Sequence, residues 1–257
     1  MSQSNGRRVA VVTGVSRRIG IGAAVARRLA GAGVDVFLHH WEPHDVEQPW
    51  GADRGGAQVI ADELATTGVR VEQLAADFAD PDAPAEVIGA AVAAFGHVDV
   101  LVANHARSCT QSLEELTADE VDLTYAVNTR ATLLLVKEFA RKHDDERPGR
   151  VVMMTSGQHR GPMPSELPYI ASKGALHQLT SSLAAHLAPR NITVNTVDPG
   201  ATDTGYADEE TIRAVVENAP MGRWGQPDDA ARLISWLTGP DAGWVTGQVI
   251  VSNGGGW

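Results

Sequence analysis

A tyrosine and a lysine stand four residues apart in the sequence Tyr-Ile-Ala-Ser-Lys, at Tyr169 and Lys173, and Ser156 lies thirteen positions upstream of the tyrosine. Residues at positions i and i+4 share one face of an α-helix, so the ammonium is expected beside the phenol. A free phenol titrates near pH ~10, and a neighbouring cation favours its ionised form and lowers its pKa. The spacing therefore predicts a tyrosine suited to general acid–base catalysis. The alternative is an ordinary exposed Tyr/Lys pair on a helix.

A glycine-rich turn follows the first apolar run of the chain. The sequence Thr-Gly-Val-Ser-Arg-Arg-Ile-Gly-Ile-Gly, residues 13–22, joins a strand-like run to an alanine-rich helical stretch. Such a turn lets the backbone approach a pyrophosphate at the N-terminus of the helix. Many α/β turns need glycine for shape only, but this position between a first strand and a helix favours a nucleotide site.

Strand-like and helix-like segments alternate along the whole chain. Short Val/Ile runs separated by helices are typical of a parallel sheet covered on both faces. Right-handed crossovers then predict an α/β, doubly wound, Rossmann-like fold of about seven strands, and we expect residues 1–257 to form a single domain. The expected strands are 9–13, 36–38, 69–75, 98–103, 151–155, 192–197 and 248–251, and the expected helices are 21–32, 54–67, 83–95, 118–141, 169–187 and a pair within 208–237.

One connection, residues 40–53, is longer than the two to six residues usual between a strand and a helix. It carries Trp41 and Trp50 together with two prolines. The segment is expected either to fold over a cofactor or a neighbouring subunit, or to pack on its own tryptophans at the surface. The histidines in and beside it lack the helical spacing and the cysteine partners of a metal site, so no metal is predicted.

Composition excludes several classes of function. The net charge of −11 argues against nucleic acid or an anionic membrane as the main partner. Cys109 is the only cysteine, which excludes an intrachain disulfide and a cysteine-based metal cage. No run of 18 apolar residues occurs, and the polar start lacks the apolar region of a signal peptide, so a cytoplasmic protein is expected.

The motifs together resemble those of the short-chain dehydrogenase/reductase family over essentially the whole chain. Within that family the sequence looks most like reductases of β-ketoacyl carrier-protein thioesters and their small-carbonyl relatives. The resemblance implies an NAD(P)-dependent enzyme that reduces a ketone or β-ketoacyl-type carbonyl to an alcohol, or runs the reverse reaction. The residues that carry it are Thr13-Gly14, Gly20-Ile21-Gly22, Asn104, Asn128, Ser156, Tyr169, Lys173 and Pro199-Gly200.

The resemblance also implies a role for each matching residue. Tyr169 would donate the proton in reduction, and Lys173 would lower its pKa and hold the ribose hydroxyls of the nicotinamide half. Ser156 would bind the substrate oxygen and stabilise charge developing on it. Asn128 would bend its helix and hold a water linking Lys173 to solvent. The implied cofactor-binding residues are Gly14, Ser16, Arg17, Arg18, Gly20, Ile21, Gly22, His40, Asp77, Phe78, Asn104, Ala106, Tyr169, Lys173, Pro199, Gly200, Thr202 and Thr204.

The chain departs from the family pattern in three places, of which Ser-Asn-Gly-Gly at residues 252–255, where the family has Val-Asp-Gly-Gly, is interpreted as structural. The glycine turn is two residues longer than the family's turn, with the two inserted residues placed before Gly20. The competing register puts Arg18 where the family has its middle glycine, but it displaces the start of the helix, so we prefer the insertion. Ala-Asn-His-Ala, residues 103–106, stands where the family has Asn-Asn-Ala-Gly. Asn104 keeps the polar anchor, whereas Ala106 is expected to crowd the backbone near the ribose.

Cofactor preference has a physical basis in the second strand. An acidic side chain at the end of that strand binds the ribose of NAD and repels the extra phosphate of NADP. His40 occupies this position, and Arg17 and Arg18 are placed to pair with a phosphate, whereas Glu42 is the one contrary feature. NADP(H) is therefore favoured over NAD(H).

The substrate is left open by the sequence. Residues 203–223 are expected to form a substrate lid, whose acidic Asp208, Glu209 and Glu210 disfavour strongly anionic substrates. A carrier-protein thioester is the family default, while a small-molecule carbonyl or alcohol such as a sugar, polyol or xenobiotic is an alternative. A non-catalytic nucleotide sensor is a further alternative, although such proteins typically lose the tyrosine or the lysine.

Assembly is predicted from a leucine stripe on the helix 169–187. Leu176, Leu179, Leu183 and Leu187 follow helical spacing, and the stripe can pack either on the sheet or against a second subunit. The resemblance implies a homotetramer, completed by residues 250–257 with Trp257 buried against a neighbour.

Overall fold

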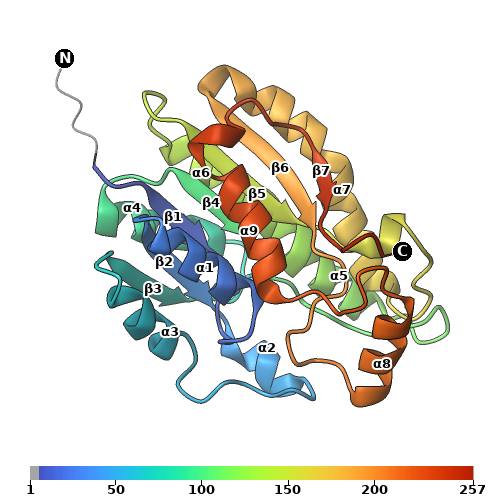
Figure 1. Ribbon diagram of the computed structural model, residues 1–257. Helices are drawn as coiled ribbons and strands as arrows, with labels where there is room; N and C mark the ends of the chain where they lie inside the picture. The colour runs from blue at the N-terminus through green and yellow to red at the C-terminus, as the bar shows by residue number, and fades with distance from the viewer. Residues whose placement is uncertain (1–5, 257) are drawn as a thin grey trace.

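The structure is a computed structural model that describes residues 6–256, and Trp257 lies outside them (Figure 1). Seven parallel strands form one sheet in the order β3-β2-β1-β4-β5-β6-β7, which confirms the doubly wound, Rossmann-like fold. The strands are β1 (Val9–Val12), β2 (Asp35–His40), β3 (Val71–Ala75), β4 (Val100–Ala103), β5 (Gly149–Met154), β6 (Ile192–Asp198) and β7 (Val249–Val251).

The helices fall where the sequence predicted them, with two differences. A short helix, α2, lies inside the long connection after β2, and the predicted helix 118–141 is divided by a π-helical turn, η1. The α-helices and this turn are α1 (Ile21–Gly31), α2 (Glu42–Glu47), α3 (Gly56–Ala65), α4 (Ala83–Phe95), α5 (Ala118–Tyr125), η1 (Ala126–Arg130), α6 (Ala131–Lys142), α7 (Leu167–Leu187), α8 (Glu209–Asn218) and α9 (Pro227–Leu237).

Helices cover both faces of the sheet because its central strands are apolar on both sides (Figure 1). Alternate residues of β1 enter different cores: Ala10 and Val12 pack with α1, α3 and α9, whereas Val9 and Val11 pack with α4, α6 and α7. In the leucine stripe of α7, Leu176 and Leu187 are buried in the second core, so at these two positions the stripe packs inside the subunit.

The sheet order reverses between β1 and β4, which are hydrogen-bonded neighbours although β2 and β3 lie between them in the sequence. In open parallel sheets the crevice at such a switch point, beyond the carboxyl ends of the strands, is where ligands bind. The turn after β1, the loop after β4 and α2 all begin at this edge. Among residues 6–256, no helix is long and apolar enough to cross a membrane.

Candidate active site

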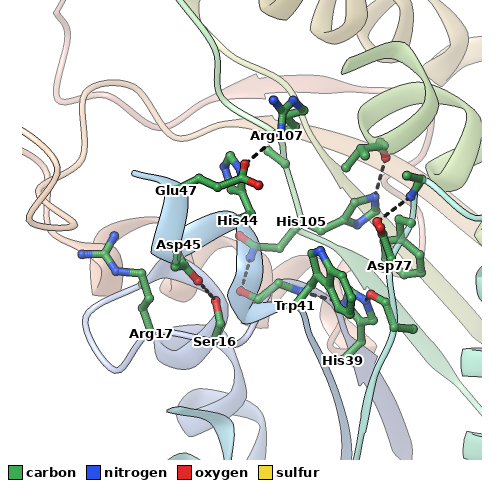
Figure 2. A pocket seen from close by; sticks show the side chains of 18 of the residues that line it. Ser16, Arg17, His39, Trp41, His44, Asp45, Glu47, Asp77, His105 and Arg107 are labelled. Atoms are coloured by element: carbon green, nitrogen blue, oxygen red, sulfur yellow. Dashed lines mark hydrogen bonds and ion pairs between the residues drawn. The ribbon is translucent and has the colours of Figure 1, made fainter. Parts of the chain in front are cut away.

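A cavity of about 360 Å³ opens at the switch point (Figure 2). Its walls come from the glycine turn, from α2 with the residue before it, and from the segments that follow β3 and β4. Nine of the residues predicted to bind a cofactor lie in these walls, and Thr204 from the segment after β6 joins them. The nine are Gly14, Ser16, Arg17, Gly20, Ile21, Asp77, Phe78, Asn104 and Ala106.

The glycine turn has the longer register that the sequence favoured. Helix α1 begins at Ile21 with Gly20 as its N-cap, so the two extra residues lie in the turn ahead of it. Gly22 packs against the turn, since a Cβ there would lie 2.6 Å from the carbonyl oxygen of Gly14. Asn104 holds the turn by donating to the carbonyls of Thr13 and Gly14 at 3.0 and 3.2 Å. The predicted polar anchor is therefore in place.

Two buried histidines support the floor of the cavity. The His39 ring stacks on Phe78 with 3.9 Å between ring centres, and the His105 ring meets the same Phe78 ring edge to face at 4.4 Å. Burial lowers the pKa of His39 to about 4 and holds the pKa of His105 well below its ordinary value. Both rings are thus neutral at physiological pH. His105 Nδ1 lies 2.7 Å from the Thr13 hydroxyl and Nε2 lies 3.0 Å from the carbonyl of Val127, which ties β1 to η1.

Helix α2, inside the long connection of residues 40–53, forms a wall of the cavity. Trp41, His44, Asp45 and Glu47 all line the cavity, so the segment folds over it (Figure 2). Asp45 is buried and accepts hydrogen bonds from the Ser16 hydroxyl at 2.5 Å and from the indole N–H of Trp50 at 3.2 Å. These bonds fasten the segment to the glycine turn.

The two arginines of the turn have different surroundings. Arg17 lines the cavity, its guanidinium lies 5.4 Å from the centre of the Trp50 ring, and its buried Nε has no hydrogen-bond partner within residues 6–256. Arg18 lies outside the cavity and is paired with Asp53, which accepts from its backbone N–H at 2.6 Å and lies 3.3 Å from its Nε. Of the two, only Arg17 lines the cavity. His40 does not line the cavity either; its ring lies 4.0 Å from the carboxylate of Glu42.

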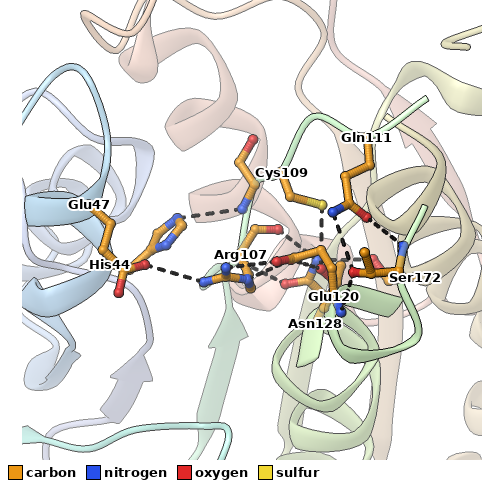
Figure 3. Close-up of polar contacts among 11 residues, drawn as sticks. His44, Glu47, Arg107, Cys109, Gln111, Glu120, Asn128 and Ser172 are labelled. Carbon is orange, nitrogen blue, oxygen red and sulfur yellow. Dashed lines mark hydrogen bonds and ion pairs between the residues drawn. The ribbon is translucent and has the colours of Figure 1, made fainter. Parts of the chain in front are cut away.

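A polar network runs from α2 to the helix that carries the tyrosine (Figure 3). Arg107 forms two hydrogen bonds with Glu120, at 2.7 and 3.0 Å, and approaches Glu47 at 3.5 Å. Its backbone N–H donates to the Asn128 side chain at 2.7 Å and its carbonyl accepts from that side chain at 3.0 Å. Asn128 also donates to the Ser172 hydroxyl at 2.9 Å. The loop between β4 and α5 is thereby connected to α2 through Glu47 and to α7 through Asn128 and Ser172.

Asn128 lies in the π-helical turn η1, which interrupts the helix predicted over residues 118–141, and π-helical turns of this kind often mark functional sites. Its side chain is fully buried and is occupied by the bonds to Arg107 and Ser172. Its carbonyl accepts from the Thr132 hydroxyl at 2.7 Å. The side chain therefore fixes the loop after β4 rather than facing either cavity.

A second cavity, of about 560 Å³, continues from the first and contains the catalytic candidates. Arg17, Ile21 and Thr204 line both cavities, so the two form one connected site. Ser156, at the end of β5, and Tyr169, in the first turn of α7, line the second cavity together. Three further predicted residues complete this side of the site: Pro199, Gly200 and Thr202.

Lys173 lies beneath the tyrosine, as the i, i+4 spacing predicted. Its Nζ is 5.8 Å from the centre of the Tyr169 ring and donates to the carbonyl of Met154 at 3.1 Å. Burial lowers the pKa of Lys173 to about 8 and raises the pKa of Tyr169 to about 12, while a hydrogen bond with Ser156 acts in the opposite direction on the phenol. The pKa of Tyr169 thus lies above its ordinary value, contrary to the predicted direction, because desolvation, together with nearby groups such as Glu166 and Asp198, outweighs the hydrogen bond with Ser156.

Several residues of the site carried no motif in the sequence. Four come from the long connection after β2, and the others come from β2, the loop after β4, the segment before α7 and the expected lid. Tyr206 in the lid lines the second cavity, whereas Asp208 caps α8 by accepting from the N–H of Thr211 at 2.8 Å and lines neither cavity. The predicted influence of the lid acids on substrate charge is therefore not supported. The wall residues without a motif include His39, His44, Asp45, Glu47, Trp50, His105, Arg107, Met163, Glu166 and Tyr206.

Comparisons with known proteins agree with this geometry. A family model described as enoyl-(acyl carrier protein) reductase matches residues 14–256. The uncharacterized oxidoreductase YjdA of Bacillus subtilis is 39% identical over 99% of this chain and 98% of its own length. The hydroxynaphthalene reductase-like protein Arp2 of Metarhizium majus is 32% identical over 96% of this chain and 94% of its own.

The structural comparison is equally extensive. A short-chain dehydrogenase from Burkholderia cenocepacia, solved in complex with NADP, is 35% identical with a TM-score of 0.86, and the match covers 97% of each chain. With the fold, the motifs and the relatives in agreement, the chain belongs to the short-chain dehydrogenase/reductase family of oxidoreductases, which act on alcohol and carbonyl groups.

Proposed function

We propose that this protein is an NADPH-dependent carbonyl reductase in which Tyr169 donates the proton. The observation that carries the proposal is the shared cavity wall of Ser156 and Tyr169, which adjoins the cavity at the glycine turn. A bound nicotinamide cofactor would supply the hydride, so the protein need supply only orientation, one proton and electrostatic stabilisation.

The residues of the first cavity fit a phosphorylated dinucleotide. Gly14 has a φ of +72°, and a Cβ there would lie 2.7 Å from the Cα of His105, so the turn can keep this close approach only with glycine. The unpartnered Nε of Arg17 offers a donor for a phosphate oxygen. Asp77 and Phe78 would hold the adenine, and Asn104 with Ala106 would border the ribose.

Preference for NADP(H) over NAD(H) is supported by charge. The end of β2 carries the neutral His40 instead of a carboxylate, and Arg17 supplies a cation at the cavity wall. Glu47 and Asp45 are the opposing charges, but Asp45 is committed to Ser16 and Trp50, and Glu47 faces Arg107. The Burkholderia relative was solved with NADP, which is consistent with this preference.

The protein's own part in the reaction follows from the second cavity. The Ser156 hydroxyl would donate to the substrate carbonyl oxygen and stabilise the negative charge that develops there. The Tyr169 hydroxyl would transfer its proton to the same oxygen, and its raised pKa keeps the proton on the phenol at neutral pH. Lys173 would hold the ribose of the nicotinamide half and favour the phenolate once the proton has left. Pro199, Gly200 and Thr202 would seat the nicotinamide.

Absorbance at 340 nm tests the proposal directly. Loss of NADPH absorbance with a panel of ketones, faster than loss of NADH absorbance at the same concentration, is the expected result. An enzyme that uses NADH at least as well would contradict the cofactor preference, and one that oxidises polyols or sugars but reduces no ketone would favour the alternative of an alcohol dehydrogenase. A carrier-protein β-ketoacyl thioester belongs in the panel as the family default.

A further inference from the structure

We propose that Trp50 and Tyr206 form an aromatic corner that selects uncharged, planar ring carbonyl compounds as substrates. The inference rests on the proposed carbonyl reduction and adds the substrate class. Trp50 comes from the long connection after β2 and Tyr206 from the lid after β6, yet both line the cavity that contains Ser156 and Tyr169. Segments far apart in the sequence therefore meet at the substrate.

The geometry of the corner suits a flat ring. The centres of the two rings lie 6.3 Å apart and their planes are 76° from parallel, so one ring presents its edge to the other. A planar molecule can stack on one face while it meets the other ring at a right angle, and both arrangements are favourable for aromatic pairs. A flexible acyclic chain gains neither contact.

The corner is held in place from both sides. The indole N–H of Trp50 donates to the buried Asp45, and the ring lies against the Arg17 guanidinium. Tyr206 packs edge to face on Trp224, which is only 5% exposed, with 5.9 Å between ring centres. These contacts restrain both rings, which lowers the entropy lost when a substrate binds against them.

The remaining walls favour a neutral substrate. Pro162 and Met163 supply apolar surface near the corner. Glu166 lines the same cavity, and burial raises its pKa. When ionised, Glu166 repels an anionic substrate, and when protonated it offers a hydrogen-bond donor to a hydroxyl or carbonyl on the ring. Arg160, which also lines this cavity, is paired with Asp198 at 2.9 Å.

The test compares KM for 2-tetralone, a bicyclic aryl-fused ketone, with KM for ethyl acetoacetate, in the presence of NADPH. Wild-type enzyme is expected to have the lower KM for 2-tetralone. Trp50→Ala should raise that KM on the order of tenfold and change the KM for ethyl acetoacetate by less than about twofold. Trp50→Phe keeps a ring and should restore most of the loss, and Trp244→Ala, at a side chain that is 98% exposed, should change neither KM.

Equal changes in both KM values for Trp50→Ala, or no change in either, would overturn the proposal. Thermal melting followed by circular dichroism verifies that the variants fold. Binding of 2-naphthol, measured by calorimetry with and without NADP⁺, separates this inference from the proposed function. If 2-naphthol binds wild type about tenfold more tightly than Trp50→Ala while no ketone is reduced, binding by the aromatic corner is supported and the proposed reductase function is contradicted. Equal affinity of wild type and Trp50→Ala for 2-naphthol would contradict the role of the corner in binding, whatever the rate of ketone reduction.

Discussion

Lys173 Nζ lies 5.8 Å from the centre of the Tyr169 ring, close enough to stabilise a phenolate yet bonded to the carbonyl of Met154 and not to the phenol. Burial acts on both members of the pair in the direction that disfavours charge, raising the pKa of the phenol and lowering that of the ammonium. Tyr169 is therefore an acid that keeps its proton at neutral pH. This state suits the reductive direction, in which the tyrosine must give a proton.

Tyr169→Phe tests the proton donor. The substitution keeps the ring but removes the transferable proton, so carbonyl reduction should fall by at least the ~10²-fold typical of a lost general acid. NADPH affinity, measured by fluorescence titration, should change little. Turnover close to that of wild type would show that the proton comes from elsewhere.

Lys173→Met tests the buried ammonium through stability. Between pH 8, near the folded pKa, and pH 10.5, the ordinary pKa of a lysine side chain, the unfolded chain binds more protons at this site than the folded chain. The wild-type free energy of unfolding should therefore rise with pH across this window, by about 3 kcal/mol at most, and this contribution is absent from Lys173→Met. Urea unfolding without added nucleotide should show the variant's stability relative to wild type falling as pH rises from 8 to 10.5. Lys142→Met, at an exposed lysine, is the control and should show no such trend.

Arg17→Ala and Arg18→Ala form a matched pair in the glycine turn. Loss of a charge-assisted bond to phosphate should weaken NADPH binding to Arg17→Ala by about 1.5–3 kcal/mol. Arg18 is paired with Asp53 outside the cavity, so Arg18→Ala should bind NADPH nearly as wild type does. NADH affinity should be unaffected in both. Equal losses for the two cofactors would show that the arginines shape the turn and do not bind the phosphate.

Glu47→Gln tests whether α2 restrains a bound cofactor. The Glu47 carboxylate is 62% exposed and 3.5 Å from Arg107, and exposed ion pairs contribute about 0–1 kcal/mol. Stopped-flow measurement of NADPH release should therefore show an increase of up to about fivefold. Glu63→Gln removes a comparable surface pair, with Arg27, that touches neither cavity, and should leave release unchanged. The same effect in both variants would argue against a role for α2.

Light scattering at micromolar concentration tests assembly. The resemblance to the family predicts a homotetramer, or at least a dimer, and Trp236 and Trp244 are large exposed side chains near the C-terminal part of the sheet that a partner subunit could cover. A monomer that turns over substrate at the full rate would contradict the prediction.

The sequence was sufficient for the order of the elements and for most of the site. Alternating apolar runs predict the parallel sheet, and the topology then brings residues from β1, β4, β5 and β6 to one edge. Motif order placed Ser156 beside Tyr169 in the second cavity. These features follow from local periodicity and from strand direction, which can be read without knowing any distant contact.

Other features depend on contacts that spacing does not reveal. Helix α2 has only six residues, too few for a periodic signal, and its position depends on Asp45 meeting Ser16 and Trp50. The direction of the Tyr169 pKa depends on exclusion of water, whereas the Tyr/Lys spacing reports only on proximity. Arg18 was grouped with Arg17 because they are adjacent, but adjacent residues in a turn can point to different sides.

The connection after β2 has a consequence for how this enzyme can be altered. Asp45 borders one cavity, Trp50 borders the other, and the hydrogen bond between them joins the two positions. Substitutions chosen to change the nucleotide used and those chosen to change the compound reduced should therefore show strong epistasis, since residues in direct contact rarely contribute independently. A directed-evolution library would have to vary positions 41–53 together, because stepwise selection for one trait would shift the other.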